Sequence, residues 1–311
     1  MNRIVRYLPC FLFAFASSLT SCESENEPIM ETISFAAQTK EMHSRAPIVN
    51  DAEDIEDFNS FVVWGNYNNT NNTEEVFEAQ EVRRSTTNPT SIWEYSPVQE
   101  WVATADSYVF SAYSPSGDVS STVVGNMLQS ITVDTKTYQQ DLMMAYATVQ
   151  KANFGRTVTP IFNHALGAIN FNFSLAEGYT YIKKYTVKSV QLENVYTQGT
   201  FTLNTDNTIT PPAEPNDVAS VAIPNIPENA TFTLAQPYVS DHLFVIPQKG
   251  DKVTLTVVIE VDGETKTLTQ ENFSIDWGMG KITTYNITIN PFFYITVQTT
   301  GWDVLEPKIT V

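Results

Sequence analysis

The side chain with the clearest chemical potential in this sequence is the thiol of Cys22, which stands in the stretch Leu-Thr-Ser-Cys-Glu-Ser-Glu. Only one other cysteine, Cys10, occurs among the 311 residues. Sulfur is a nucleophile that accepts groups covalently, and its reactivity depends on the surroundings of the thiol. The residues on either side of Cys22 therefore indicate what it reacts with.

The residues before Cys22 have the order of a secretory signal. Arg3 and Arg6 supply positive charge, residues 8–16 are almost wholly apolar, and residues 17–21 are small and polar. The apolar part is too short to cross a bilayer as a helix, so the pattern predicts a signal peptide. Its removal also removes the first cysteine, which leaves the exported chain without a pair for an internal disulfide.

The stretch Leu19-Thr20-Ser21-Cys22 resembles the lipobox of bacterial lipoproteins. The resemblance implies a signal peptide over 1–21, cleavage between Ser21 and Cys22, and a lipid with palmitate-type chains on the sulfur. Each buried acyl CH₂ contributes about 0.8 kcal/mol, so two or three chains anchor a protein firmly to a membrane. The acidic tether 22–31 resembles the export signal of surface lipoproteins and equally fits a plain solvated segment. The alternative for the cysteine is an unmodified residue in an ordinary cleaved signal.

The charge of the chain argues against two classes of partner. Acidic residues number 35 and basic residues 17, for a formal net charge of −18. Loss of Arg3 and Arg6 with the signal leaves 15 basic residues and a charge of −20. Nucleic acids require clustered basic residues that displace counterions, and anionic lipid surfaces attract basic segments. We expect neither partner. The length is sufficient for two hydrophobic cores of ordinary size.

The sequence contains no recognisable catalytic, cofactor-binding or metal-binding motif. The phosphate loop, the dinucleotide fingerprint and the nucleophile elbow are missing, and His43, His164 and His242 are too widely separated for a metal site. His164 is expected to be a structural histidine. The acidic residues between 51 and 57 lack the glycine and the spacing of a calcium loop, which favours a solvated loop. We therefore expect no enzyme, no metal and no cofactor, although a carboxylate pair for glycoside hydrolysis stays open.

The elements that must position any site have the pattern of strands. Residues 169–175 alternate Ile, Phe, Phe and Leu with Asn, Asn and Ser, and residues 253–261 place Val, Leu, Val, Ile and Val on one face. Such patterns of period two, separated by turns, predict antiparallel β-sandwiches. Residues 141–147 fit either one turn of helix or another strand. No amphipathic helix of convincing length is apparent, so the predicted fold class is all-β.

The ends of the predicted sandwiches follow from two local features. Residues 32–36 predict a short first strand with Ile33 and Phe35 on one face. A break in composition divides the rest of the chain near its middle. The predicted domains are an N-terminal β-sandwich over 32–158 and a C-terminal β-sandwich over 159–311.

Several segments follow one another in the order of a known set of motifs. They are Phe61-Val62-Val63-Trp64-Gly65-Asn66-Tyr67, Trp93-Glu94-Tyr95-Ser96-Pro97, Tyr108–Pro115, Phe162-Asn163-His164-Ala165-Leu166 with Ile169 and Phe171, and Trp277–Ile289. Together they resemble the Bacteroidales-type fimbrillin family over most of the chain. The resemblance implies a structural or adhesive subunit of a surface fimbrium and not a catalyst. It also implies two tandem transthyretin-like β-sandwiches and a lipidated precursor on the cell outer membrane.

The same resemblance implies how such a subunit polymerises. In polymerising members an outer protease cuts after an arginine and removes the anchor with an N-terminal strand, and the groove left behind accepts a strand of the next subunit. Arg45 is the candidate processing site, with a plain exposed loop arginine as the alternative. The candidate donor strand contains Phe293, Ile295 and Val297, whose alternation fits an ordinary edge strand equally well. That alternative gives a tip or anchor subunit, so stalk, tip and anchor all stay open.

Two other classes of function are compatible with the sequence. Trp93, Tyr95 and Trp101, if exposed, would stack on sugar rings, as in a surface glycan-binding lipoprotein of a polysaccharide-uptake system. A lipidated glycosidase is the third alternative and has the least support. In the fimbrial interpretation the partners are other fimbrial subunits, the outer membrane through the lipid, and a ligand on a host or bacterial surface.

Overall fold

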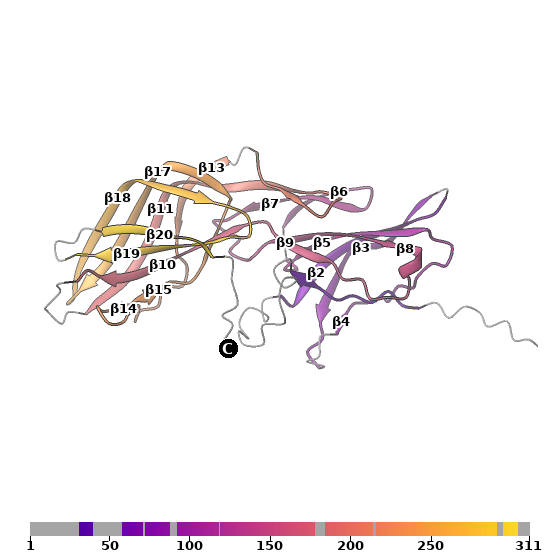
Figure 1. Ribbon diagram of the computed structural model, residues 1–311, viewed down its shortest axis with the longest axis horizontal. Helices are drawn as coiled ribbons and strands as arrows, with labels where there is room; N and C mark the ends of the chain where they lie inside the picture. Colours follow the sequence, from indigo (N-terminus) through magenta and orange to yellow (C-terminus); the bar gives the residue numbers. More distant parts are fainter. Residues whose placement is uncertain are drawn as a thin grey trace, which may run out of the picture.

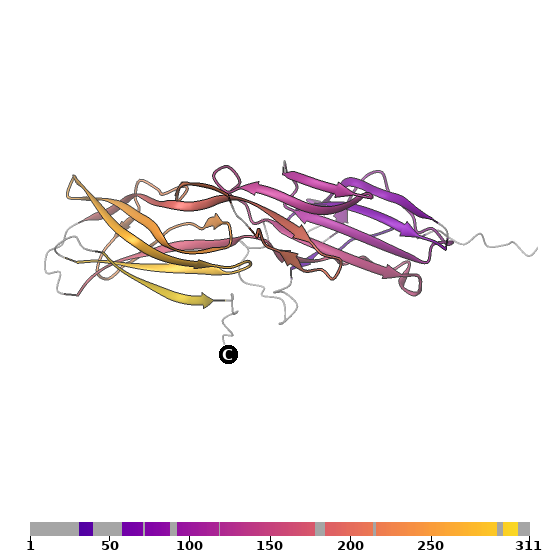
Figure 2. The same cartoon turned by 90° about the horizontal axis from the view of Figure 1, so that it is seen from above.

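The computed structural model describes residues 31–39, 58–70, 72–87, 92–117, 119–177, 184–213, 216–290 and 295–303. Within these ranges the chain consists of strands joined by turns, with one short 3-10 helix, η2 (Lys151–Asn153). No helix of the described part is long and apolar enough to cross a membrane. The prediction of an all-β chain of sandwich type is confirmed. Figures 1 and 2 show an elongated molecule in which the strands run largely along the long axis.

The first of three sheets, here called the N-terminal sheet, has seven strands in the order β1-β9-β8-β5-β2-β3-β4. Its strands are β1 (Gln38–Thr39), β2 (Ser60–Asn68), β3 (Thr73–Arg84), β4 (Trp93–Glu94), β5 (Ser107–Ser114), β8 (Met143–Gln150) and β9 (Ile161–His164). The ambiguous segment 141–147 is mostly strand β8. Met143 and Met144 are both buried, in cores on opposite faces of the sheet. A strand covered on both faces lacks the alternation that identifies strands in a sequence.

The second sheet, here called the shared sheet, has the order β18-β17-β11-β7-β6, and β12, β13 and β14 also pair with β11. Its strands are β6 (Ser120–Val124), β7 (Met127–Asp134), β11 (Tyr185–Leu203), β12 (Ile209–Thr210), β13 (Asn216–Ala222), β14 (Thr231–Phe232), β17 (Gln248–Val261) and β18 (Glu264–Trp277). The 19-residue strand β11 holds this sheet together, because it pairs with β17 near its start and with β7 near its end.

The third sheet, here called the C-terminal sheet, has the order β15-β10-β19-β20, and β16 also pairs with β10. Its strands are β10 (Gly167–Leu175), β15 (Tyr238–Val239), β16 (Leu243–Val245), β19 (Ile282–Ile289) and β20 (Ile295–Asp303). β10 and β19 run parallel, from Ala168 opposite Ile282 to Leu175 opposite Ile289. The sequence predicts both strands but not this pairing, because local alternation does not reveal which distant strand lies alongside.

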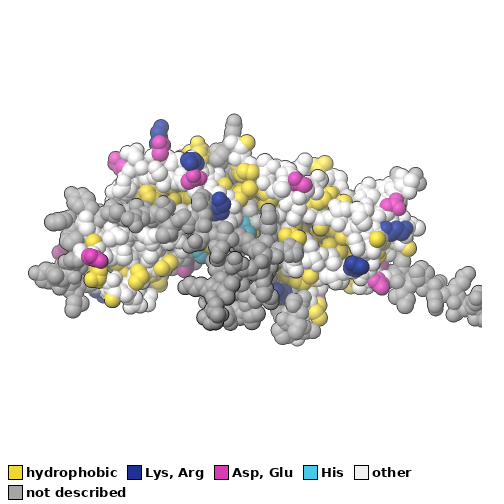
Figure 3. Space-filling view, in the orientation of Figure 1, with side chains coloured by type: hydrophobic (Ala, Val, Ile, Leu, Met, Phe, Trp, Pro, Cys, Tyr) yellow, Lys and Arg dark blue, Asp and Glu magenta, His cyan; other side chains and the backbone are white. Residues whose placement is uncertain are grey.

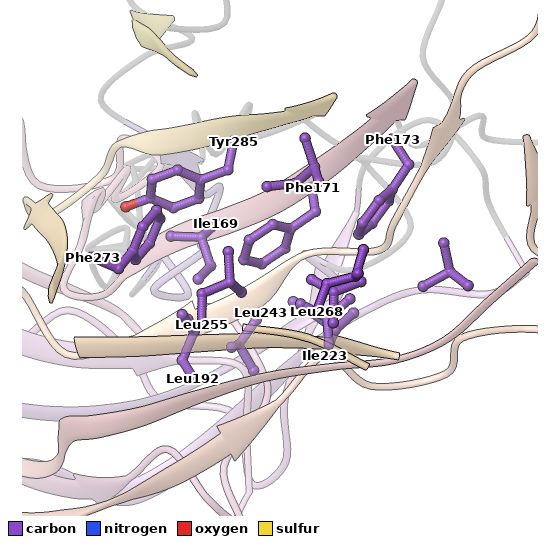
Figure 4. Packing of buried hydrophobic residues seen from close by; sticks show 14 of the residues in the cluster. Ile169, Phe171, Phe173, Leu192, Ile223, Leu243, Leu255, Leu268, Phe273 and Tyr285 are labelled. Carbon is purple, nitrogen blue, oxygen red and sulfur yellow. The ribbon is translucent and has the colours of Figure 1, made fainter. Parts of the chain in front are cut away.

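Three clusters of buried side chains lie between these layers. The C-terminal core fills the space between the C-terminal sheet and the first part of β11 with β17 and β18. Figure 4 shows Phe171 of the C-terminal sheet pointing toward Leu255 of the shared sheet, and the ring of Tyr285 lying beside Phe273. The middle core joins one face of the N-terminal sheet to β7 and the end of β11, and the N-terminal core covers the opposite face of that sheet.

The strand pairing crosses the predicted boundary between the domains 32–158 and 159–311. β9 follows that boundary in the chain but pairs with β8, and β7 precedes it but pairs with β11. β11 itself contributes Val187 to the C-terminal core and Phe201 to the middle core. The division into two domains stays a prediction.

Tyr285 places a hydroxyl group inside the C-terminal core, where the Nε1–H of Trp277 donates a hydrogen bond to it at 2.8 Å. Burial raises the pKa of Tyr285 to about 12. We expect Tyr285→Phe to lower the free energy of unfolding by about 1–3 kcal/mol, because the buried indole N–H loses its acceptor. Urea unfolding of both proteins at neutral pH measures this loss.

The raised pKa of Tyr285 also predicts a dependence on alkaline pH. The folded state retains the phenol proton between about pH 10 and about pH 12, whereas the unfolded chain loses it near pH 10. This contribution to stability is fully present below about pH 10 and is lost as the pH rises toward 12. At about pH 11 the wild type should therefore have lost about 1 kcal/mol more than Tyr285→Phe, relative to neutral pH. Equal losses in the two proteins would contradict the assignment.

Candidate functional site

The feature that departs most from a regular sandwich is the segment 31–39, here called the plug segment, which covers part of the N-terminal core. One edge of it is hydrogen-bonded to the chain just before β5. The backbone N–H of Ile33 donates to the carbonyl of Gln99 at 2.9 Å, and the N–H of Trp101 donates to the carbonyl of Glu31 at 3.0 Å. This edge has the geometry of a short antiparallel bridge.

The other edge of the plug segment is hydrogen-bonded to the chain leading into β9. The N–H of Ala36 donates to the carbonyl of Val158 at 2.9 Å, and the N–H of Val158 donates to the carbonyl of Ser34 at 2.8 Å. Further along, the N–H of Gln38 donates to the carbonyl of Pro160 at 3.2 Å. The plug segment is thus held on both edges, as a strand inserted between two others would be.

The side chains of the plug segment alternate as the sequence predicts. Ile33 and Phe35 are 1% and 4% exposed, and the residues next to them, Thr32 and Ser34, are exposed. The ring of Phe35 makes edge contacts at centroid distances of 5.5–5.8 Å with four rings, those of Phe61, Phe77, Tyr95 and Phe110. Edge-to-face pairs contribute about 0.5–1.5 kcal/mol each beyond burial of area, so Phe35 is the main anchor of the segment.

Tyr95 fixes the position of the plug segment through its hydroxyl group. The hydroxyl donates to the carbonyl of Ile33 at 2.5 Å and accepts from the N–H of Gln99 at 3.3 Å. Burial raises the pKa of Tyr95, so its proton stays in place for this bond at neutral pH. The residues that form the walls of the groove, Gln99 and Val158, were missed in the sequence. They act through the backbone, and no side-chain pattern marks them.

Four residues of the predicted processing, lipidation and donor-strand sites lie outside the described residues. These are Ser21, Cys22, Arg45 and the first residue of the donor candidate, Phe293. Arg45 follows the plug segment by six residues in the chain, counted from Thr39. A cut there would separate the plug segment from the rest of the protein.

The remaining donor residues, Ile295 and Val297, lie in β20, which pairs antiparallel with β19 at the edge of the C-terminal sheet. Val297 stands opposite Ile287, and Ile295 stands opposite Ile289. In this structure β20 is therefore an edge strand of its own chain. Donation to another subunit requires it to leave β19.

The aromatic residues considered for sugar stacking belong to the N-terminal core. Trp93 and Trp101 are 7% and 4% exposed, and the side chain of Tyr95 is half-buried against Phe35. The three side chains thus form no exposed platform. The condition for sugar stacking, exposure of these rings, is thus not met by either tryptophan.

The structure separates the histidines that it describes. Nδ1 of His164 lies at hydrogen-bonding distance, 2.6 Å, from Oδ2 of Asp141, and His242 lies exposed elsewhere in the chain. His43 and the acidic stretch 51–57 lie outside the described residues. Among the side chains that the structure describes, no group of three or more His, Cys, Asp or Glu could hold a metal ion. On the face in Figure 3, uncharged side chains cover most of the described surface, and charged ones stand singly or in small groups.

The structure is similar to solved proteins of Bacteroides species. A fimbrial protein from Bacteroides vulgatus ATCC 8482 has a TM-score of 0.56 at 15% identity, covering 88% of this chain and 99% of that one. Candidate cell adhesion proteins from Bacteroides uniformis ATCC 8492 and Bacteroides ovatus ATCC 8483 both have a TM-score of 0.54. Their identities are 16% and 17%, and they cover 86% and 88% of this chain and 96% of their own. At such identities the likeness establishes the fold alone.

The sequence itself gives a second, independent comparison. No curated protein sequence matches the chain significantly. The model of a protein family described as fimbrillin-like matches residues 44–307, which is most of the chain and includes all three sheets apart from β1. The motifs around β2, β5, β10 and β19 thus belong to one continuous family pattern, and the chain belongs to the fimbrillin-like family.

Proposed function

We propose that this protein is a subunit of a cell-surface fimbrium and that it joins other subunits by strand exchange at the groove under the plug segment. The observation that carries the proposal is the plug segment itself, which is hydrogen-bonded on both edges and buries Ile33 and Phe35. Membership of the fimbrillin-like family supports a structural subunit and not an enzyme. The names of the similar solved proteins, fimbrial and cell adhesion, are compatible with this role.

Strand exchange would be driven by the unpaired backbone groups and exposed rings that remain when the plug segment is removed. Removal of the plug segment would leave backbone groups of Gln99, Trp101 and Val158 without their partners. It would also expose the rings that surround Phe35. An extended strand from a second subunit would satisfy the same backbone groups and place alternate apolar side chains on the same rings. Such a contact joins unlike surfaces and produces a filament, since it does not close on itself.

The processing step and the anchor are proposed from the sequence. Cleavage after Arg45 would release the tether 22–31 together with the plug segment. A lipid on Cys22, after removal of residues 1–21, would hold the uncut precursor on the outer membrane, so the same cut would free the subunit from the membrane. The precursor would be closed and anchored, and the product would be open and competent to polymerise.

The donor strand is proposed to be the segment that contains Phe293, Ile295 and Val297. Its alternation supplies three large apolar side chains on one face, whereas the plug segment has two, Ile33 and Phe35, followed by the small Ala37. Because β20 pairs with β19, donation costs the bonds of that pair, and a subunit that keeps β20 in place would end a fibre. The first case is a stalk subunit and the second a tip or anchor subunit.

One experiment tests the anchor, the cut and the exchange together. Cells producing the protein are supplied with labelled palmitate, and the purified precursor is then treated with an arginine-specific protease. We expect labelled precursor, an unlabelled product that begins at Ala46, and ladders of oligomers formed by the product alone. Arg45→Ala should stay labelled and form no ladder, and Cys22→Ala should carry no label but still be cut. A cut product that never forms oligomers would remove the stalk role.

No described feature favours glycan binding as a second function. The aromatic residues that suggested it, Trp93 and Trp101, are buried in the N-terminal core and are needed there for packing. A ligand on a host or bacterial surface stays part of the proposal only as the target of adhesion by the assembled fimbrium.

A further inference from the structure

β6 is an edge strand of unusual accessibility. It pairs on one side with β7, and it ends the order of strands in the shared sheet. All five of its residues, Ser120–Val124, are exposed, and the side chains of Val123 and Val124 are 40% and 58% exposed. Figure 1 shows the strand at the upper margin of the molecule. An edge strand presents unpaired N–H and C=O groups that can pair with another chain.

Two other long edge strands of the described structure, β3 and β18, carry features that block such pairing, whereas β6 carries none. A third, β20, is also free of charge before Asp303 and is the strand proposed above as the donor. The edge formed by β3 has four acidic residues, Glu74, Glu75, Glu78 and Glu81, and an irregularity at Ala79, which has φ of 48°. The edge formed by β18 has charged residues at Glu264, Lys266 and Glu271 and an irregularity at Asn272, with φ of 55°. Charges and bulges are the usual protection of sheet edges. The sequence of β6, Ser-Ser-Thr-Val-Val, contains no charge, no proline and no glycine.

The backbone of β6 is regular although its pairing with β7 contains a bulge. Thr122 stands opposite Ser130 and Val123 stands opposite Leu128, so the extra residue, Gln129, belongs to β7. The free edge of β6 therefore presents an uninterrupted strand of five residues. Its β-branched residues favour the extended conformation that a new partner strand requires.

The turn that follows β6 holds the strand in place on the N-terminal sheet. Nδ2 of Asn126 donates to Oδ1 of Asn66 at 2.9 Å and to the carbonyl of Phe77 at 2.9 Å. In return, Nδ2 of Asn66 donates to the carbonyl of Gly125 at 2.8 Å. Because these bonds fix the hairpin before any partner arrives, little conformational entropy is lost when a strand adds to its edge.

We propose that β6 is a self-association edge, at which two copies of this chain pair antiparallel about a two-fold axis through Thr122. In that register Thr122 faces its own copy, Ser121 faces Val123, and Ser120 faces Val124. The choice of a second copy rests on charge. Two exported chains, each with a net charge of −20, repel one another wherever acidic residues meet, so copies of this chain can pair only at an edge without charge. In the two-fold register of β6 every facing pair is uncharged. A two-fold contact of this kind closes, so it is separate from the open-ended strand exchange proposed above.

The test uses the uncut precursor in detergent, in which the plug segment is retained and strand exchange does not occur. Sedimentation over a range of concentrations should show a reversible monomer–dimer equilibrium for the wild type. Thr122→Lys and Thr122→Glu should each weaken the dimer about fivefold or more, because like charges then stand opposite one another across the axis. An equimolar mixture of the two variants should regain a dimer containing one copy of each.

The matched controls are Thr267→Lys and Thr267→Glu, since Thr267 is an exposed threonine on the edge strand β18. They should leave the equilibrium unchanged. A wild type that stays monomeric at its solubility limit, or a dimer that survives Thr122→Lys, would overturn the proposal. A dimer lost in both Thr122 variants but not regained in their mixture would overturn the two-fold register. A monomer that binds an added extended peptide at β6 would assign the edge to a different occupant.

Discussion

Replacing Phe35 by alanine should lower the free energy of unfolding by about 3–5 kcal/mol, the cost typical of removing a buried phenylalanine. The reason is its position at the centre of four rings, with 4% of its surface exposed. The cavity left by the ring lies under a segment that has only one other buried anchor, Ile33. Urea unfolding followed by tryptophan fluorescence measures the loss.

The control for Phe35→Ala is Thr32→Ala, which changes an exposed neighbour in the same segment. It should alter the free energy of unfolding by no more than about 0.5 kcal/mol. The free energy lost in Phe35→Leu should lie between the losses in Phe35→Ala and Thr32→Ala, because leucine keeps an apolar side chain but loses the ring contacts. A loss below about 1 kcal/mol for Phe35→Ala would mean that the plug segment is not part of the cooperatively folded N-terminal core.

The same variant distinguishes a replaceable plug from an integral strand. If the plug segment is a placeholder for a donor strand, weakening its anchor should make the groove easier to open without unfolding β2, β5 or β8. Hydrogen exchange at Ala36 and Val158, whose amides bond across the plug edge, should then accelerate more than exchange at amides inside β5. Under the proposed function, a donor that buries a valine where the plug segment has Ala37 gains about 1–2 kcal/mol over the plug.

Much of the fold is encoded in local patterns and could be predicted from them. The alternation over 169–175 places Phe171 and Phe173 in the C-terminal core, both fully buried. A first short strand was predicted over 32–36, whereas the structure has isolated bridges at Thr32 and Phe35 and places β1 at Gln38–Thr39. Ile33 and Phe35 are both buried, as predicted. In each case one face meets a core and the other meets polar surroundings, so burial leaves a period of two in the sequence.

The pairing of strands could not be predicted in the same way. β7 pairs with β11 some 60 residues later, and β10 lies parallel to β19 more than 100 residues later. These registers depend on which strands meet in space, and a local hydrophobic pattern is compatible with many partners. β8 was ambiguous for a related reason, since Met143 and Met144 are buried on opposite faces.

Only part of the candidate site could be predicted from the sequence. The plug could be predicted, because its side chains alternate. Its groove could not be predicted, because Gln99 and Val158 bind it through backbone groups that every residue possesses. The self-association edge at β6 could not be predicted from the sequence either. A chargeless run of five residues becomes informative only when the structure places it at an edge beside other edges that are charged.

The second large effect is expected from Phe201→Ala, which should lower the free energy of unfolding by about 3–5 kcal/mol. Phe201 is fully buried in the middle core, near the end of β11, where it packs with residues of the N-terminal sheet. The start of the same strand lies in the C-terminal core, with Val187 fully buried there. Because β11 contributes to both cores, loss of order at its end should also weaken its hydrogen bonds with β17 near its start.

Phe201→Ala should therefore destabilise both halves of the molecule together. Hydrogen exchange followed by mass spectrometry should show faster exchange in peptides from β5 and from β17 by similar factors, although β17 does not belong to the core that contains the mutated residue. Val98→Ala, which changes a side chain that is 60% exposed, should leave exchange in the peptides of β5 and β17 unchanged. Faster exchange confined to β5 would mean that β11 does not couple the stability of the two cores, and that the regions 32–158 and 159–311 unfold as independent domains. Coupled exchange would instead mean that β11 joins the two cores into one cooperatively folded unit.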